Sequence, residues 1–207
     1  MDEPEPIVFI VDDDEAIRRS SSLLLETVGI KTETFTSCEE FLNAYDPAQA
    51  GCLVLDVRMR GMSGLELQAK LKADRVDIPV VIITGHGDVP MAVKAMQNGA
   101  IGFIEKPFRD QVLLDNVQKA IELETQVRRE RIKRTDIEAK LALLTKRERE
   151  IMDLLITGKA NKMIAHELGI SHKTVDFHRG NILEKMGVDS VVELLRLTQK
   201  LDLPKQN

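Results

Sequence analysis

Short runs of apolar and β-branched residues alternate with amphipathic, helix-like segments along the first half of the chain. The first run, Ile7–Val11 (IVFIV), is apolar throughout, as expected of a strand covered on both faces of a parallel sheet. Strands are predicted at Ile7–Val11, Thr32–Phe35, Cys52–Leu55, Pro79–Ile83 and Gly102–Ile104. Because a helix-like segment follows each strand, the pattern predicts an α/β fold, a doubly wound five-stranded parallel sheet with helices on both faces.

Composition divides the chain into three segments. Residues 1–122 carry 12 Lys and Arg against 21 Asp and Glu, whereas residues 123–207 carry 17 against 13. Residues 123–144 are highly charged and lack glycine and proline, which predicts a solvated helical linker; a coiled-coil seam is the alternative, although the apolar positions keep no clean heptad. Residues 145–207 are predicted to form a second, all-α domain. The basic C-terminal part suits a polyanionic partner, although ordinary surface charge would also explain it.

The sequence also indicates where the protein acts. No apolar run approaches the roughly 20 residues that span a bilayer. The acidic start, MDEPEP, differs from the basic start of a signal peptide. Cys38 and Cys52 lack CxxC spacing and a neighbouring histidine cluster, so Cys52 is expected to be a buried core residue and not a redox or metal group. We therefore expect a cytoplasmic protein with no membrane contact.

Polar side chains follow the predicted strands at the point where each one ends. Asp12-Asp13-Asp14 follow the first strand, and Asp56, Thr84 and Lys106 follow the third, fourth and fifth. Open parallel sheets bind ligands beyond the carboxyl ends of their strands, where the strand order reverses. With the order 2-1-3-4-5, strands one and three flank that point, so these groups are expected to converge in one crevice.

Clustered carboxylates repel one another unless a cation neutralises them, and Mg²⁺ accepts one or two carboxylates while it keeps water and phosphate ligands. An aspartate can attack phosphorus to form an aspartyl phosphate, and Lys106 with Mg²⁺ would then screen the phosphoryl oxygens. Each residue also has a simpler interpretation: Asp13 or Asp14 could cap a helix, Thr84 could cap a turn, and Lys106 could be a surface charge. Their joint position at strand ends favours a site.

Residues 7–120 resemble a response-regulator receiver domain, which has the flavodoxin-like fold. The resemblance rests on IVDDDE (10–15), LVLDVRMRGMSG (53–64), VIITGHGD (81–88) and FIEKPF (103–108), and TGHGDVPMAV (84–93) is closest to the FixJ-like subgroup. The roles that it implies are an acidic pair, Asp12 and Asp13; the phosphoacceptor, Asp56; a switch hydroxyl, Thr84; a phosphate-side lysine, Lys106; and a switch aromatic, Phe103. It further implies that the Arg58 carbonyl binds Mg²⁺ and that the Lys106–Pro107 bond is cis.

One position departs from that family. Arg60 stands where receiver domains usually carry proline, which predicts a looser loop after Asp56 but changes no chemical group. A phosphatase with an aspartate nucleophile on a similar sheet is the enzymatic alternative. Such enzymes have a second Asp two residues after the first, whereas this chain has Arg58 there, so we expect no enzyme.

Residues 161–180 fit a helix-turn-helix. Apolar side chains stand where two crossing helices pack, and Gly169 supplies the turn. An αα-hairpin core is the structural alternative, and a protein- or RNA-binding helical module is the functional one. With LTKREREIMDLLITGKANKMIAHELGISHKTVDFH (144–178), however, the segment resembles the LuxR/FixJ-type DNA-binding domain over residues 145–200. Members of that family use their final helix to dimerise on DNA.

The recognition helix, residues 172–186, can be phased from its own apolar residues. Val175, Ile182 and Met186 form one narrow stripe. His178 flanks that stripe and is expected to be structural, and Arg179 is expected to reach a phosphate or an acid instead of a base. Phosphate contacts suit Lys173 and Thr174, a cytosine amino group suits Asp176, and a thymine methyl suits Phe177. The predicted DNA-contacting residues are Lys162, Lys173, Thr174, Asp176, Phe177, Gly180 and Asn181.

These resemblances imply a two-component response regulator. A sensor histidine kinase would phosphorylate Asp56, which would control dimerisation and binding to double-stranded DNA. The implied partners are the kinase, DNA, RNA polymerase and a second copy of the chain, on phosphorylation and on DNA. Transcription would be regulated, with activation the expected direction.

Overall fold

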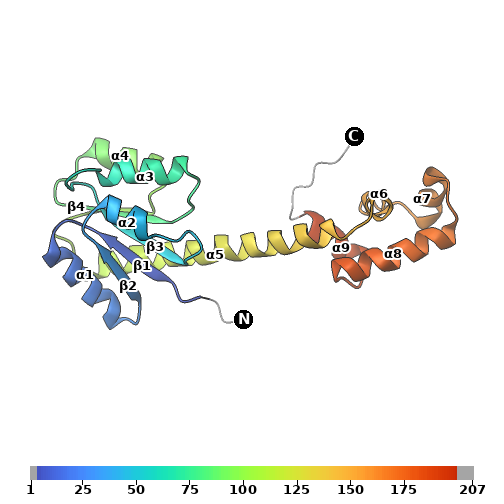
Figure 1. Cartoon of the computed structure of the whole chain (residues 1–207), viewed down its shortest axis with the longest axis horizontal. Coiled ribbons are helices and arrows are strands. Elements are labelled where there is room, and N and C mark those ends of the chain that lie inside the picture. The colour runs from blue at the N-terminus through green and yellow to red at the C-terminus, as the bar shows by residue number, and fades with distance from the viewer. Residues whose placement is uncertain (1–3, 200–207) are drawn as a thin grey trace. The chain divides into compact units, whose positions relative to one another are not determined.

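The computed structural model describes residues 4–199; the outermost residues of the expected first and last domains, 1–3 and 200–207, lie outside the described part. The chain divides into two compact units, one up to Arg128 and the other from Arg129 onward (Figure 1). Within the described residues, no helix combines the length and apolar character that crossing a bilayer requires.

The first unit is the predicted five-stranded parallel sheet, with strand order β2-β1-β3-β4-β5. Its elements are β1 (Ile7–Val11), α1 (Glu15–Thr27), β2 (Lys31–Phe35), α2 (Cys38–Ala44), β3 (Gly51–Asp56), α3 (Gly64–Ala73), β4 (Val80–Thr84), α4 (Val89–Gln97), β5 (Gly102–Glu105) and the first part of α5 (Asp110–Ala142). The expected α/β class and strand order are confirmed.

Two apolar layers hold this unit together, one on each face of the sheet. Phe9 and Leu53 point to the face covered by α2, α3 and α4, while Ile10 and Val54 point to the face covered by α1 and α5. The alternation follows from the two-residue period of a strand. Cys52 is fully buried, and burial raises the pKa of its thiol to about 12, in keeping with the predicted core residue.

The helices begin where local side chains satisfy their free amides. Asp14 caps α1 by accepting a hydrogen bond from Ala16 N–H at 2.8 Å, as one of the simpler interpretations of the aspartate run predicted. Asp12 and Asp13 precede that cap, so this role leaves their side chains available for another. The run Asp12-Asp13-Asp14 is therefore divided between helix capping and the edge of the sheet.

The second unit is all-α, and the predicted helix-turn-helix is present as α7 and α8. It contains the last part of α5, α6 (Lys146–Leu155), α7 (Asn161–Leu168), α8 (His172–Met186) and α9 (Val191–Gln199). Gly169 ends α7 in the left-handed conformation, with φ of 64°. Ile137 and Leu141 of α5 are buried in the core of this unit. The segment expected as a solvated linker is thus helical as far as Ala142, and its last turns pack into the second core.

Candidate functional site

Three carboxylates gather at the carboxyl edge of the sheet. Asp12 and Asp13 follow β1 and Asp56 ends β3, and one ligand oxygen of each lies within 4.8 Å of the others. Asp12 and Asp56 are buried, whereas Asp13 is exposed to solvent. Oxygen ligands on neighbouring strand ends, open to water on one side, form a donor set that fits a hard divalent cation such as Mg²⁺.

Lys106 joins two of these carboxylates. Its Nζ donates hydrogen bonds to Asp12 Oδ2 at 2.6 Å and to Asp56 Oδ1 at 2.8 Å. Burial raises the pKa of Asp56, and the hydrogen bond from Lys106 opposes that rise. Burial alone would lower the pKa of Lys106, but its two carboxylate partners outweigh burial and raise it. The Lys106 side chain therefore bridges the buried Asp12 and Asp56 carboxylates at this edge of the sheet.

Thr84 and Phe103 lie around the loop between β4 and α4. Thr84 is fully buried at the end of β4, and its Oγ1 accepts a hydrogen bond from His86 N–H at 3.4 Å. A Cβ added to Gly87 would stand 2.9 Å from Phe103 Cε1 and 3.4 Å from Thr84 Cγ2, so the Phe103 ring fills the space beside this glycine. The contact with Gly87 was not foreseen from sequence, where only the glycine in the TGHGD motif could have signalled it.

The backbone after Asp56 is tied to its side chain. Arg58 N–H donates to Asp56 Oδ2 at 2.7 Å, which places the Arg58 backbone beside the phosphoacceptor candidate. A Cβ on Gly64 would lie 2.0 Å from the Asp56 carbonyl oxygen, so the start of α3 can approach β3 only because residue 64 is glycine. The Lys106–Pro107 peptide bond is cis. The receiver-type residues predicted from sequence are thus brought to one edge of the sheet.

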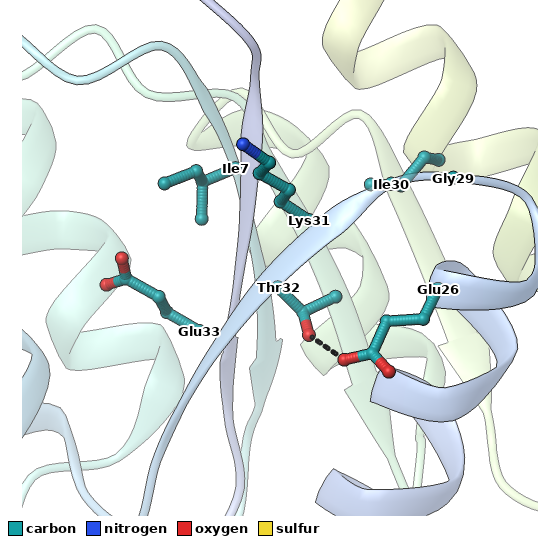
Figure 2. Close-up of a pocket in the computed structure, with 7 residues that line it drawn as sticks. All are labelled: Ile7, Glu26, Gly29, Ile30, Lys31, Thr32 and Glu33. Carbon is teal, nitrogen blue, oxygen red and sulfur yellow. Dashed lines mark hydrogen bonds between the residues drawn. The ribbon is translucent and has the colours of Figure 1, made fainter.

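A separate pocket of about 470 Å³ lies elsewhere on the first unit, and Figure 2 shows its lining. Its residues are Ile7, Glu26, Gly29, Ile30, Lys31, Thr32 and Glu33. Ile7 and Lys31 are paired at the starts of β1 and β2, the end of the sheet opposite to Asp12 and Asp56. Thr32 Oγ1 donates to Glu26 Oε1 at 3.3 Å across this pocket. The pocket therefore forms no part of the carboxylate site.

In the second unit, the apolar stripe of α8 lies where its sequence predicts. Val175, Ile182 and Met186 are fully buried. His178 is half-buried, and its Nδ1 is enclosed without a hydrogen-bond partner among the described residues. Phe177 projects on the other face and is 64% exposed, and its ring meets the His178 ring edge-on with centroids 5.6 Å apart.

The residues predicted to contact DNA differ in solvent exposure and in their hydrogen bonds within the protein. Lys162, Lys173, Asp176, Phe177 and Gly180 are exposed, whereas Thr174 and Asn181 are half-buried. Asp176 already has two internal contacts: its Oδ1 accepts from Asn161 Nδ2 at 2.6 Å, and its Oδ2 lies 2.9 Å from His172 Nδ1. Asp176 therefore links the start of α7 to α8.

Comparison with known proteins gives the same two-part organisation. Residues 8–118 match the family described as the response regulator receiver domain, and residues 142–198 match the bacterial regulatory proteins of the luxR family. The response regulator protein TmoT of Ectopseudomonas mendocina is 42% identical over 201 residues, covering 97% of this chain and 91% of TmoT. The transcriptional regulatory protein FixJ of Azorhizobium caulinodans is 43% identical, covering 94% of this chain and 92% of FixJ. The solved structure of the response regulator StyR is 46% identical, with a TM-score of 0.89, and covers 95% of this chain and 99% of StyR.

Proposed function

Because this chain belongs to the response regulators that carry a receiver domain and a LuxR-type DNA-binding domain, we propose that phosphorylation of Asp56 controls its binding to DNA. One observation carries this proposal: the buried Asp56 carboxylate lies beside Asp12, Asp13 and the Lys106 ammonium at one edge of the sheet. We assign the receiver function to residues 1–122 and the DNA-binding function to residues 145–207, joined by residues 123–144.

Asp56 acts as the nucleophile. One of its carboxylate oxygens forms a bond to phosphorus while the bond from phosphorus to the donor histidine nitrogen breaks, and that nitrogen takes up a proton. Asp12, Asp13, Asp56 and the Arg58 carbonyl would hold Mg²⁺, which would neutralise the phosphoryl oxygens during transfer. Lys106 stabilises the same developing charge from the other side, because its ammonium already lies against Asp56.

Thr84 and Phe103 couple the phosphoryl group to the surface. Thr84 moves to donate its hydroxyl hydrogen to the phosphoryl oxygen, and Phe103 turns into the space released. The face made by α4 and β5 then changes shape and becomes the contact surface between two copies of the chain. An apolar stripe on α4 supports this step, since Val89, Val93 and Met96 recur at helical spacing and are 76%, 47% and 51% exposed. Because phosphorylation shifts an existing equilibrium, a minor active population precedes it.

The helix-turn-helix binds double-stranded DNA through the outer face of α8. Lys162, Lys173 and Thr174 contact phosphates, Asp176 and Phe177 contact base edges, and Gly180 and Asn181 complete the outward face. A second dimer contact on DNA uses α9, where Val192 is 59% exposed. The bound dimer recruits RNA polymerase and activates transcription in the cytoplasm. The protein is a regulator with no catalytic turnover of its own.

The test combines labelling with DNA selection. Wild type should be labelled by a phosphohistidine donor or by acetyl phosphate, whereas Asp56→Asn should not, because an amide is a poor nucleophile. Chelation of Mg²⁺ or Asp13→Ala should also stop labelling with an unchanged circular dichroism spectrum. Asp74→Asn, which alters a surface ion pair with Lys70, serves as a matched control and should label normally. Labelling of Asp56→Asn at the wild-type level would remove Asp56 from this role, and failure to enrich any sequence from random DNA would favour a protein- or RNA-binding module.

A further inference from the structure

The loop after Asp56 bends sharply at Arg60 and Gly61. Gly61 has a φ of 82°, which is characteristic of the third residue of a type II turn. In that register Met59 is the first residue, Arg60 the second and Met62 the fourth. Proline is favoured at the second position because its ring presets φ, and Arg60 lacks that constraint. The turn therefore needs another source of rigidity.

A side chain from a different element supplies it. In a closed type II turn, the N–H of the fourth residue donates to the carbonyl of the first. Here Met62 N–H donates instead to Oε1 of Glu39, at 3.2 Å and 23 positions earlier in the chain. A Cβ on Gly61 would stand 3.1 Å from the same oxygen, so the missing side chain at Gly61 lets the Glu39 carboxylate approach the turn.

The backbone of Glu39 is fixed at the start of α2, while its side chain is exposed to solvent. It follows Cys38, which is fully buried, and Ser37 caps α2 by accepting a hydrogen bond from Glu40 N–H. The ends of the loop are tied to the sheet, because Arg58 N–H bonds to Asp56 and Gly64 N–H bonds to the Val57 carbonyl at 3.1 Å, and Met59 and Met62 pack against the core beneath it. The Met62 amide is the polar group of the turn that Glu39 satisfies. Glu39 thus connects the tip of the loop to the layer of helices on that face of the sheet.

We infer that Glu39 is a positioning residue for the phosphorylation site, which closes the turn at Arg60–Gly61 from outside and so holds the Arg58 carbonyl and the Asp56 carboxylate in place for Mg²⁺. This inference rests on the proposed function. Glu39 does what proline at position 60 would otherwise do: it reduces the number of conformations that the loop must lose when the cation binds.

A purely electrostatic effect of Glu39 is separable from its hydrogen bond. Glu39→Gln removes the charge, yet its amide oxygen can still accept from Met62 N–H. Glu39→Ala removes both. Glu40→Ala removes a neighbouring charge whose carboxylate binds only nearby groups, the N–H and hydroxyl of Thr36. Glu39→Ala/Arg60→Pro restores rigidity to the turn without the hydrogen bond.

The experiment measures two properties that need no phosphorylation. Hydrogen exchange of the Met62 amide in metal-free full-length protein should accelerate in Glu39→Ala and stay at the wild-type rate in Glu39→Gln and Glu40→Ala. Calorimetric Mg²⁺ affinity should fall about five-fold in Glu39→Ala, the factor expected for one lost hydrogen bond, and should return with Arg60→Pro. Thermal unfolding of each variant checks that the first unit is intact.

Three results would overturn the inference: wild-type Mg²⁺ affinity in Glu39→Ala, an equal loss in Glu40→Ala or Glu39→Gln, or no recovery with Arg60→Pro. Acetyl phosphate labelling of wild type and Asp56→Asn is run in parallel. If wild type is not labelled, the proposed function fails. If wild type is labelled and Glu39→Ala binds Mg²⁺ equally well, only the role of Glu39 fails.

Discussion

The Lys106 ammonium lies 2.8 Å from Asp56 Oδ1, although the two residues are 50 positions apart in the chain. The same nitrogen also bonds to Asp12, so a single cation compensates two buried carboxylates. We therefore expect a change to Lys106 to affect both the stability of the first unit and the reactivity proposed for Asp56.

Lys106→Met should destabilise the metal-free protein by about 3 kcal/mol, because it leaves buried carboxylates without their counter-charge. Added Mg²⁺ should restore part of that loss, since the cation would replace the ammonium. Urea unfolding in chelator and in Mg²⁺ measures both effects. An unchanged unfolding midpoint in chelator would show that the Lys106 contacts do not stabilise the fold.

Thr84→Val should separate phosphorylation from its output. Valine keeps the shape of the buried side chain but lacks the hydroxyl that we propose bonds to the phosphoryl oxygen. Labelling should continue, while sedimentation should no longer detect the proposed phosphorylation-dependent dimer. Wild-type protein whose monomer fraction is the same before and after labelling would contradict the dimer mechanism itself.

Glu148 should give the second unit a distinct acid dependence. A hydrogen bond from Lys185, at 2.6 Å, is the main cause that lowers the Glu148 pKa from 4.5 to about 2. Because the folded pKa is depressed, this contribution is present above pH 4.5 and is lost as pH falls toward 2. Glu148→Gln should lower the free energy of unfolding of the second unit by about 1–2 kcal/mol at neutral pH and should remove this pH dependence. Hydrogen exchange of the buried Ile151 and Ile182 amides measures both effects. If acid destabilises Glu148→Gln as steeply as wild type, groups other than Glu148 cause the acid dependence.

Lys173→Ala should weaken binding to all DNA sequences by a similar factor. Lys173 is exposed at the start of α8, where we propose that it neutralises a phosphate, so its loss should reduce the salt slope by about one. Affinity titrations at several salt concentrations on matched and scrambled selected sites test this. If Lys173→Ala lowers affinity for the matched site alone, Lys173 contacts a base and not only a phosphate.

Phe177→Ala should reduce the preference for one base pair of the binding site by roughly 1–3 kcal/mol of binding free energy, the usual range for one specific contact. Preferences at the other base pairs should change little. Arg179→Ala is the informative partner, because the half-buried Arg179 is expected to act on a phosphate or on the fold. Selection from random DNA compares the two. Relaxation of one G·C position by Arg179→Ala, with no change from Phe177→Ala, would mean that Arg179 and not Phe177 lies on the base-reading face of the recognition helix.

Local sequence patterns are sufficient to predict several features of this fold. The strand cores, the capping of α1 by Asp14, the turn at Gly169 and the buried stripe of α8 depend on residues a few positions apart, so sequence alone predicts them. At Ser37–Glu40 a local pattern is only partly realised. Ser37 caps α2 by accepting from Glu40 N–H, but the Glu40 carboxylate accepts from Thr36 and not from Ser37 N–H, so the reciprocal bond of a capping box is absent there.

Tertiary structure decided which distant groups meet. Nothing in the local sequence pairs Glu39 with Met62, Glu148 with Lys185, or Asp176 with Asn161, because each carboxylate has many donors at comparable chain distance. The choice follows from strand order and helix packing, which set the few positions within hydrogen-bond reach. The same holds for α5, whose charged sequence indicates a helix, while only the packing of Ile137 and Leu141 shows that its end belongs to the second core.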